Sequence, residues 1–180
     1  IQEEKLFVNF GGLDPKMYYP MKKKSHDKIK IGYLGGLEGR KNVILLVETF
    51  KKLVNDYDNI ELHVGGGGKS VQKFKEMKIK NTFFHGFIPE NEVNKFLNSL
   101  DIFVYPTLGE GFGSDPVQAM GCGLPVIASN RSSMPEVVGD AGILAEPDVG
   151  SMYDAIAKLI ENKTLRKKVA EKCYERSKEL

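Results

Sequence analysis

The sequence contains no tryptophan, two cysteines and no apolar run close to the roughly 20 residues that a membrane-spanning helix needs. Cys122 and Cys173 are too few for a disulfide framework, which favours a reducing compartment. The first residues carry neither a starter methionine nor the pattern of a signal peptide. These absences exclude a disulfide-stapled secreted domain and an integral membrane protein, and we predict a cytoplasmic location.

An excess of charge of one sign is also missing. The 26 basic and 24 acidic residues leave a net charge of +2, so nucleic acid is not an expected partner. A length of 180 residues favours one domain, and an apolar share of 41% suffices for its core. Because residues 1–5 look like an internal cut and the end of the chain stops within a helical pattern, we interpret residues 1–180 as the second half of a two-domain enzyme.

Short apolar strands alternate with helical patterns along the chain. Strands are expected at residues 5–9, 29–34, 60–64, 82–84, 102–105, 126–128 and 143–144. Helices are expected at residues 42–56, 71–77, 92–100, from 114 or 115 to about 122, and at 151–161 and 164–180. This alternation predicts the α/β class, with a Rossmann-like parallel sheet that carries helices on both faces.

Residues 110–129, with the sequence EGFGSDPVQAMGCGLPVIAS, are the most informative segment. The continuous apolar run before them, Ile102–Tyr105, is typical of a strand buried on both faces. Gly111 and Gly113 remove side chains where a backbone must bend sharply or approach a ligand. A glycine loop between the carboxyl end of a parallel strand and a helix is a ready site for anionic groups such as pyrophosphate.

The helix inside this segment has recognisable ends. Ser114 or Asp115 can cap its N-terminus with a side-chain oxygen, and Pro116 suits its first turn. Gly123 and Pro125 are expected to end it, just before the next apolar strand begins.

This segment resembles the donor-site signature of family 4 (group 1) of the retaining glycosyltransferases with the GT-B fold, E-G-F-G-x-x-x-x-E-A-M-x-x-G-x-P-V. Glu110 stands at its first glutamate, and Gln118 stands at its second. Three further segments resemble family motifs: residues 31–42 a strand followed by G-R-L-x-x-x-K-G, residues 83–89 F-x-G-F-V-P, and residues 134–142 P-E-V-V-G-D-A-G. The four occur in the family's order across roughly residues 5 to 160, so the chain is identified as a member.

The resemblance implies the nucleotide-sugar-binding C-terminal half of a GT-B enzyme of polysaccharide biosynthesis. Such a hexosyltransferase moves a sugar from a nucleoside diphosphate sugar to an acceptor with retention of configuration, and it needs no metal or other cofactor. A glycan, lipid or other acceptor would bind mainly to an N-terminal domain outside this sequence. This fragment alone is therefore expected to be inactive, and the full-length protein is expected to contact a membrane peripherally.

The resemblance also implies roles for individual residues. Glu110 would be catalytic and would hold the transferred sugar near its reacting carbon. Lys41 would neutralise the diphosphate leaving group, and Arg40 would supply the cation that the family places where this chain has Gly36. Gln118 would bind the ribose more weakly than a glutamate, because an amide has a single acceptor oxygen. The remaining expected donor-binding residues are Gly35, Gly36, Gly65, Gly66, Phe87, Gly111, Phe112 and Gly113.

The sequence does not match three other functional patterns, those of a P-loop, a dinucleotide-binding loop and a metal site. Residues 65–70 resemble a phosphate-binding P-loop, but G-x-x-x-x-G-K-[ST] would need a glycine where the chain has His63. The dinucleotide fingerprint G-x-G-x-x-G fails at Pro116, which disfavours an oxidoreductase. His26, His63 and His85 are scattered without carboxylates or cysteines at ligand spacing, so no metal site is expected.

Two other interpretations stay open. Gln118 and Gly36 depart from the family pattern, which favours a non-catalytic nucleotide-sugar-binding subunit or a degenerate transferase. A sugar-nucleotide epimerase of the same architecture is disfavoured, because residues 134–142 resemble the transferases more. For single residues, the plain alternatives are a solvated loop glutamate at Glu110, an exposed Lys41 and an ordinary helix glutamine at Gln118.

Overall fold

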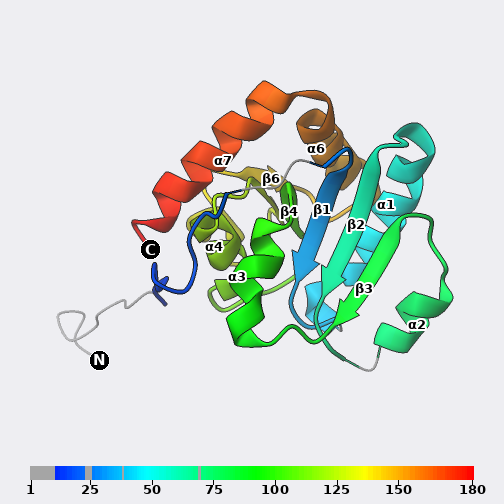
Figure 1. Ribbon diagram of the computed structural model, residues 1–180, viewed down its shortest axis with the longest axis horizontal. Helices are drawn as coiled ribbons and strands as arrows, with labels where there is room; N and C mark the ends of the chain where they lie inside the picture. Colours follow the sequence, from blue (N-terminus) through cyan, green and yellow to red (C-terminus); the bar gives the residue numbers. More distant parts are fainter. Residues whose placement is uncertain (1–10, 23–25, 38, 69) are drawn as a thin grey trace.

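The computed structural model describes residues 11–22, 26–37, 39–68 and 70–180. Its centre is a six-stranded parallel sheet with strand order β3-β2-β1-β4-β5-β6, flanked by helices (Figure 1). The strand expected at residues 5–9 lies outside the described residues. The six other expected strands are all present, so the predicted Rossmann-like α/β fold is confirmed.

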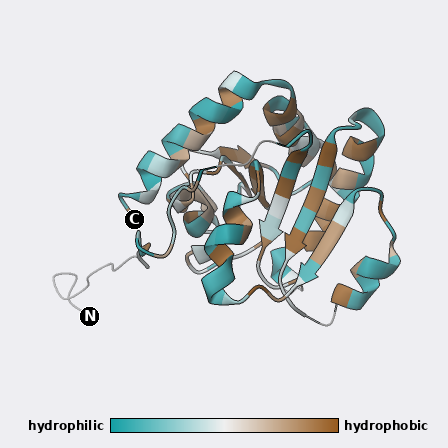
Figure 2. Cartoon of the chain, in the orientation of Figure 1, coloured by the Kyte–Doolittle hydropathy of each residue, from teal (hydrophilic) through white to brown (hydrophobic). Residues whose placement is uncertain are grey.

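The strands follow the apolar runs of the sequence closely. They are β1 (Ile29–Leu34), β2 (Ile60–Gly65), β3 (Thr82–Gly86), β4 (Ile102–Tyr105), β5 (Val126–Ser129) and β6 (Ile143–Ala145). Every residue of β4 and β5 is buried, which explains why both are continuous apolar runs. Figure 2 shows hydrophobic residues concentrated in the central strands and hydrophilic residues on the outward faces of the helices. The strands β3 and β6 form the two edges.

Helices alternate with the strands along the chain. They are α1 (Val43–Asp56), α2 (Val71–Glu76), α3 (Glu90–Asn98), α4 (Ser114–Gly121), α5 (Met134–Val137), α6 (Val149–Glu161) and α7 (Lys163–Ser177), with a 3-10 turn η2 (Gly39–Lys41). The sequence did not predict η2 and α5. The helix α6 starts two residues before its expected start, because Asp148 caps it by accepting a hydrogen bond from Ser151 N at 2.9 Å.

Two helix layers enclose the sheet. The helices α1 and α6 contact each other on one face, whereas α3 lies on the other, in front of the sheet in Figure 1. The helix α7 contacts both α6 and α4. Buried residues from the sheet and both layers form one hydrophobic cluster. Among the described residues, no helix combines the length and the apolar character that crossing a bilayer requires.

The strand order creates a crevice at one end of the sheet. The chain runs from β1 outward through β2 to β3, returns across the sheet to β4, and continues in the opposite direction to β6. The loops after β1 and β4 therefore diverge to opposite sides. In open α/β sheets, ligands bind at such a reversal, beyond the carboxyl ends of the strands.

Candidate functional site

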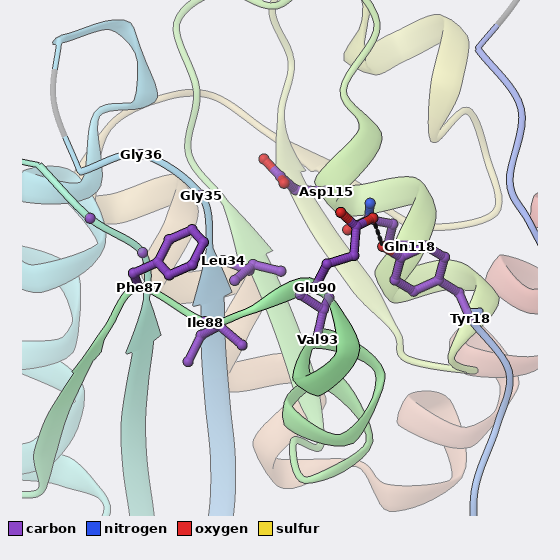
Figure 3. A pocket seen from close by; sticks show the side chains of 12 residues that line it. Tyr18, Leu34, Gly35, Gly36, Phe87, Ile88, Glu90, Val93, Asp115 and Gln118 are labelled. Atoms are coloured by element: carbon purple, nitrogen blue, oxygen red, sulfur yellow. Dashed lines mark hydrogen bonds between the residues drawn. The ribbon is translucent and has the colours of Figure 1, made fainter.

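A pocket of about 330 Å³ opens at this crevice (Figure 3). It lies beyond the ends of β1 and β2, between the loop after β3 and the first turns of α3 and α4. Its lining residues are Tyr18, Leu34, Gly35, Gly36, Gly66, Gly67, Phe87, Ile88, Glu90, Val93, Asp115 and Gln118. Five residues expected to bind a donor are among them: Gly35, Gly36, Gly66, Phe87 and Gln118.

Backbone contacts between successive loops form one wall of the pocket. Gly35 N donates to Gly65 O at 3.1 Å, and Gly66 N donates to Gly86 O at 2.7 Å. Gly66 has a φ of 137°, and a Cβ at this position would lie 1.7 Å from Gly35 O. Gly65 is buried, and a Cβ there would meet Ile88 at 3.0 Å. Gly65 thus supports the pocket without lining it, whereas Gly66 lines it.

The loop after β3 forms the opposite side of the pocket. Phe87 follows Gly86 and remains 78% exposed, the largest value among the exposed large apolar residues of the described chain. Figure 3 shows its ring at the edge of the pocket. An aromatic ring at this position is free to pack against a flat apolar group of a ligand.

The start of α4 differs from the prediction. Neither Ser114 nor Asp115 caps this helix with its side chain; the N-cap position is Gly113, with a φ of 102°. The glycine takes this left-handed conformation without a Cβ penalty, so the chain enters the helix directly. The side chain of Asp115 turns to the pocket instead. Gln118 lies three residues further on the same face, as expected for helical spacing, and also lines the pocket.

Beside the pocket lies a charged group that we call the Lys41 cluster, made of Lys41, Tyr105, Glu110 and Asp115. Lys41 Nζ lies 2.9 Å from Glu110 Oε1 and 3.4 Å from Asp115 Oδ2, and it donates to the Tyr105 hydroxyl. It also lies 5.0 Å from the centroid of the Tyr105 ring. Two carboxylates and an aromatic face therefore hold the lysine, which is 18% exposed. The cluster meets the pocket at Asp115.

Glu110 is the most deeply placed charge of the cluster. Its side chain is 6% exposed, and Oε1 accepts from Thr107 Oγ1 at 3.0 Å as well as from Lys41. Burial raises the pKa of this carboxyl, but hydrogen bonds from Lys41, Thr107 and Tyr105 outweigh burial and leave the pKa below its usual value. Glu110 is therefore ionised at neutral pH. Its second oxygen, Oε2, faces Arg40 Nη2 at 3.7 Å.

Two tyrosines near the ends of neighbouring strands support the cluster. Tyr33 lies one residue before the carboxyl end of β1, Tyr105 ends β4, and their rings stack at 5.8 Å. The Tyr33 hydroxyl donates to Gly36 O at 2.6 Å, and the Tyr105 hydroxyl lies 2.8 Å from Asp115 Oδ2. Burial, followed by the charge of Asp115, raises the pKa of both tyrosines, so both hydroxyls stay neutral.

The loop before α4 is fixed from outside the pocket. Ser132 Oγ donates to Glu110 O at 2.7 Å, and Ser133 Oγ donates to Phe112 O at 2.9 Å. Of the two glycines expected where the backbone bends, Gly113 has a positive φ, whereas Gly111 does not and a Cβ there would meet nothing within 4 Å. Gly111, Phe112 and Gly113 support the position of Glu110 and do not line the pocket.

The structure brings some predicted residues together and separates others. Glu110, Lys41 and Arg40 lie together: Lys41 Nζ contacts Glu110, and Arg40 Nε donates to Gly109 O at 2.8 Å, which places the Arg40 guanidinium beside Glu110. These three lie next to the pocket and do not line it. Tyr105 and Asp115 were missed as site residues. The sequence signal for Tyr105 is its place at the carboxyl end of a buried strand.

The three histidines are not all scattered, contrary to the prediction. The parallel register of β2 and β3 brings His63 Nδ1 to 3.0 Å from His85 Nε2, with the two rings stacked. Glu61 lies 3.1 Å from the other nitrogen of His63. Among the described residues, no three His, Cys, Asp or Glu side chains form a group that could hold a metal ion.

Comparisons with known proteins agree on one family. Residues 20–176 match the sequence profile described as glycosyl transferases group 1. The O-antigen chain mannosyltransferase B of Escherichia coli is 32% identical over 142 residues, which cover 74% of this chain and 37% of the relative. The capsular polysaccharide biosynthesis glycosyltransferase CapM of Staphylococcus aureus is 28% identical over 182 residues, which cover 94% of this chain and 45% of the relative.

Solved structures share the fold. The C-terminal domain of LpcC, a glycosyl transferase group 1 family protein from Francisella tularensis, superposes with a TM-score of 0.82 at 28% identity, covering 93% of this chain and 97% of that chain. HepE from Anabaena, solved in complex with UDP and glucose, superposes with a TM-score of 0.82 at 18% identity. The match covers 99% of this chain and 53% of the HepE chain. The chain thus spans 37% and 45% of the two curated relatives and nearly all of one isolated domain.

Proposed function

The chain belongs to the group 1 glycosyltransferases, and on that premise we propose that it is the donor-binding half of a retaining hexosyltransferase. The observation that carries the proposal is the pocket at the β1–β4 reversal, with a half-buried lysine–carboxylate cluster directly beside it. A pocket that combines glycine turns, a helix start and a nearby cation suits a nucleoside diphosphate.

Each part of the donor has a matching part of the site. The base would lie against Phe87, and the ribose hydroxyls would bond Gln118. The diphosphate would lie along the Gly35–Gly36 turn, near the first turn of α4 and within reach of Lys41. The transferred sugar would then lie over the Lys41 cluster, where Glu110 Oε2 is the carboxylate oxygen not already used by Thr107, Tyr105 and Lys41.

The charges of the site suit a dissociative sugar transfer. As the bond between the sugar and the diphosphate breaks, negative charge grows on the leaving group and positive charge grows on the sugar carbon. Lys41 and Arg40 would stabilise the leaving group, and the ionised Glu110 would stabilise the sugar. Retention then requires the acceptor to attack from the face that the diphosphate leaves. We propose that these two cations serve in place of a divalent metal.

The acceptor and its location are proposals as well. The relatives named above act, by their names, on the O-antigen chain and in capsular polysaccharide biosynthesis. These relatives support a glycan or lipid-linked acceptor, bound mainly by a separate N-terminal domain. Such an acceptor would bring the whole enzyme to the cytoplasmic face of a membrane through peripheral contact.

A second candidate is a nucleotide-sugar-binding subunit without activity. Gln118 weakens the ribose site relative to a glutamate, and Gly36 provides no cation. An activity assay on the full-length protein separates this candidate from an active transferase.

Binding of UDP, GDP or ADP should raise the melting temperature of this domain without added magnesium. At about one hundred times the dissociation constant, a ligand that binds only the folded state adds roughly 2.7 kcal/mol of stability. The measurement is a thermal-shift titration in the presence of EDTA, with the matching nucleosides as controls. The absence of a shift with all three diphosphates at millimolar concentration would count against the donor site.

Replacing Gln118 with glutamate should tighten ribonucleotide binding by about 1 kcal/mol, because a carboxylate accepts from two ribose hydroxyls at once while its desolvation limits the gain. The gain should be smaller for the 2′-deoxy analogue, which lacks one hydroxyl. Isothermal titration of both ligands with both proteins checks the result. Unchanged binding of the ribonucleotide would place Gln118 outside the ribose site.

A further inference from the structure

Asp115 places a carboxylate where the proposed diphosphate would bind. It is the second residue of α4, and it lines the pocket between the Gly35–Gly36 turn and Gln118 (Figure 3). Its Oδ2 atom lies against the glycine turn, since a Cβ on Gly35 would be 3.0 Å from it. The glycine turn and the helix start are the two elements that we assign to the diphosphate.

The same oxygen already contacts two donors that a diphosphate would need, the Tyr105 hydroxyl and Lys41 Nζ. Asp115 Oδ2 lies 2.8 Å from the Tyr105 hydroxyl and 3.4 Å from Lys41 Nζ. A phosphate oxygen that approached Lys41 from the pocket would compete with Asp115 for both donors. The carboxylate therefore takes the position of an anionic ligand group.

In the described part of the chain, the charged side chains around this position carry no excess of positive charge. Lys41 and Arg40 face Glu110 and Asp115, and Arg40 is 65% exposed and bonded to Gly109 O. Among the residues that the structure describes, the charged side chains that line the pocket are Glu90 and Asp115, and both are acidic. A diphosphate thus meets a lysine whose charge is balanced by Glu110, and beside this lysine lies the carboxylate of Asp115, which repels the diphosphate.

We propose that Asp115 is an internal competitor of the donor diphosphate: it holds Lys41 when no donor is bound, releases it when a nucleoside diphosphate binds, and thereby weakens binding of the diphosphate group. This inference rests on the proposed donor-binding function. It assigns Asp115 a role in product release, because the nucleoside diphosphate left after transfer is displaced more readily when a carboxylate can take back Lys41 and Tyr105.

The competing explanation is that Asp115 only orients Lys41. Glu110 already holds Lys41 at the shorter distance of 2.9 Å and is itself almost buried, so the lysine keeps its position when the charge of Asp115 is removed. The two roles predict opposite changes in the affinity for the diphosphate when the charge of Asp115 is removed. A competitor, once removed, leaves tighter diphosphate binding, whereas an orienting residue, once removed, leaves weaker binding.

The test is the variant Asp115→Asn, which removes the charge and keeps an oxygen for Tyr105. Isothermal titration with UDP, GDP, ADP and the matching nucleosides should show roughly fivefold tighter binding of the diphosphate that binds the wild type, and unchanged nucleoside binding. Asp58→Asn is the matched control. Asp58 is 97% exposed and precedes β2, at the other end of the sheet from the pocket, so the same change of charge should leave both affinities within about twofold.

The outcomes separate this inference from the proposed function. If the wild type binds a nucleoside diphosphate and Asp115→Asn binds it equally or more weakly, the competitor role is overturned and the donor site stands. If neither protein binds any of the three diphosphates, both the proposed donor site and the proposed competitor role of Asp115 are wrong. Asp115→Ala provides a second variant without charge, and a melting curve of each variant establishes that the protein is folded.

Discussion

Replacing Gly66 with alanine should destabilise the domain by about 3 kcal/mol and abolish nucleoside diphosphate binding. The φ of 137° at this position belongs to a region that is almost restricted to glycine, and the new Cβ would lie 1.7 Å from Gly35 O. Because Gly35 O is a backbone atom and the backbone of residue 66 fixes the position of its Cβ, relief requires the loops after β1 and β2 to move apart. That movement opens the wall of the pocket that we assign to the diphosphate.

The neighbouring glycine provides the control for this prediction. Gly67 also lines the pocket, but it has no positive φ, and a Cβ there would meet nothing within 4 Å. Gly67→Ala should therefore change stability by less than about 0.5 kcal/mol. Urea denaturation gives the stability of each variant, and calorimetric titration gives its affinity. Equal stabilities of the two variants would contradict the proposed clash.

Replacing Lys41 with alanine should weaken nucleoside diphosphate binding by about 1.5–3 kcal/mol and leave nucleoside binding unchanged. The reason is that only the diphosphate presents negative charge to the lysine. Titration calorimetry with a diphosphate and its nucleoside measures both losses. Lys80→Ala is a suitable control, since Lys80 is exposed and pairs with the exposed Asp58. Equal losses for the two ligands would refute the role of Lys41.

The same variant should also be less stable at neutral pH, because it leaves Glu110 almost buried without its main counter-ion. In the wild type, the pKa of Glu110 lies below its usual value. Its contribution to stability is therefore present above the pKa of the unfolded chain and is lost as the pH falls through the lower pKa of the folded chain. The stability gap between wild type and Lys41→Ala should narrow over that acidic range, as urea titrations at several pH values can show.

The sequence predicted the fold better than the site. The bounds of β1 and β4 were correct at both ends. β4 is a continuous apolar run that Pro106 ends, as expected for a buried parallel strand, and β1 is followed by the glycines Gly35 and Gly36. The cap of α4 was wrong, because the partners of Asp115 lie 10 and 74 positions away and no local pattern reveals them. His63 and His85 meet through the register of two strands, which periodicity alone does not fix. The roles of the site residues stay predictions.

The strand order has a mechanical consequence. The ladder between β1 and β4 pairs Ile31 with Ile102 and Gly32 with Phe103, and it is shorter than the six-pair ladder between β1 and β2. The pocket is lined from both sides of this seam, by the loops after β1 to β3 and by α4. A ligand held there bridges the shortest ladder of the sheet, so its binding free energy also resists the separation of the two halves of the domain.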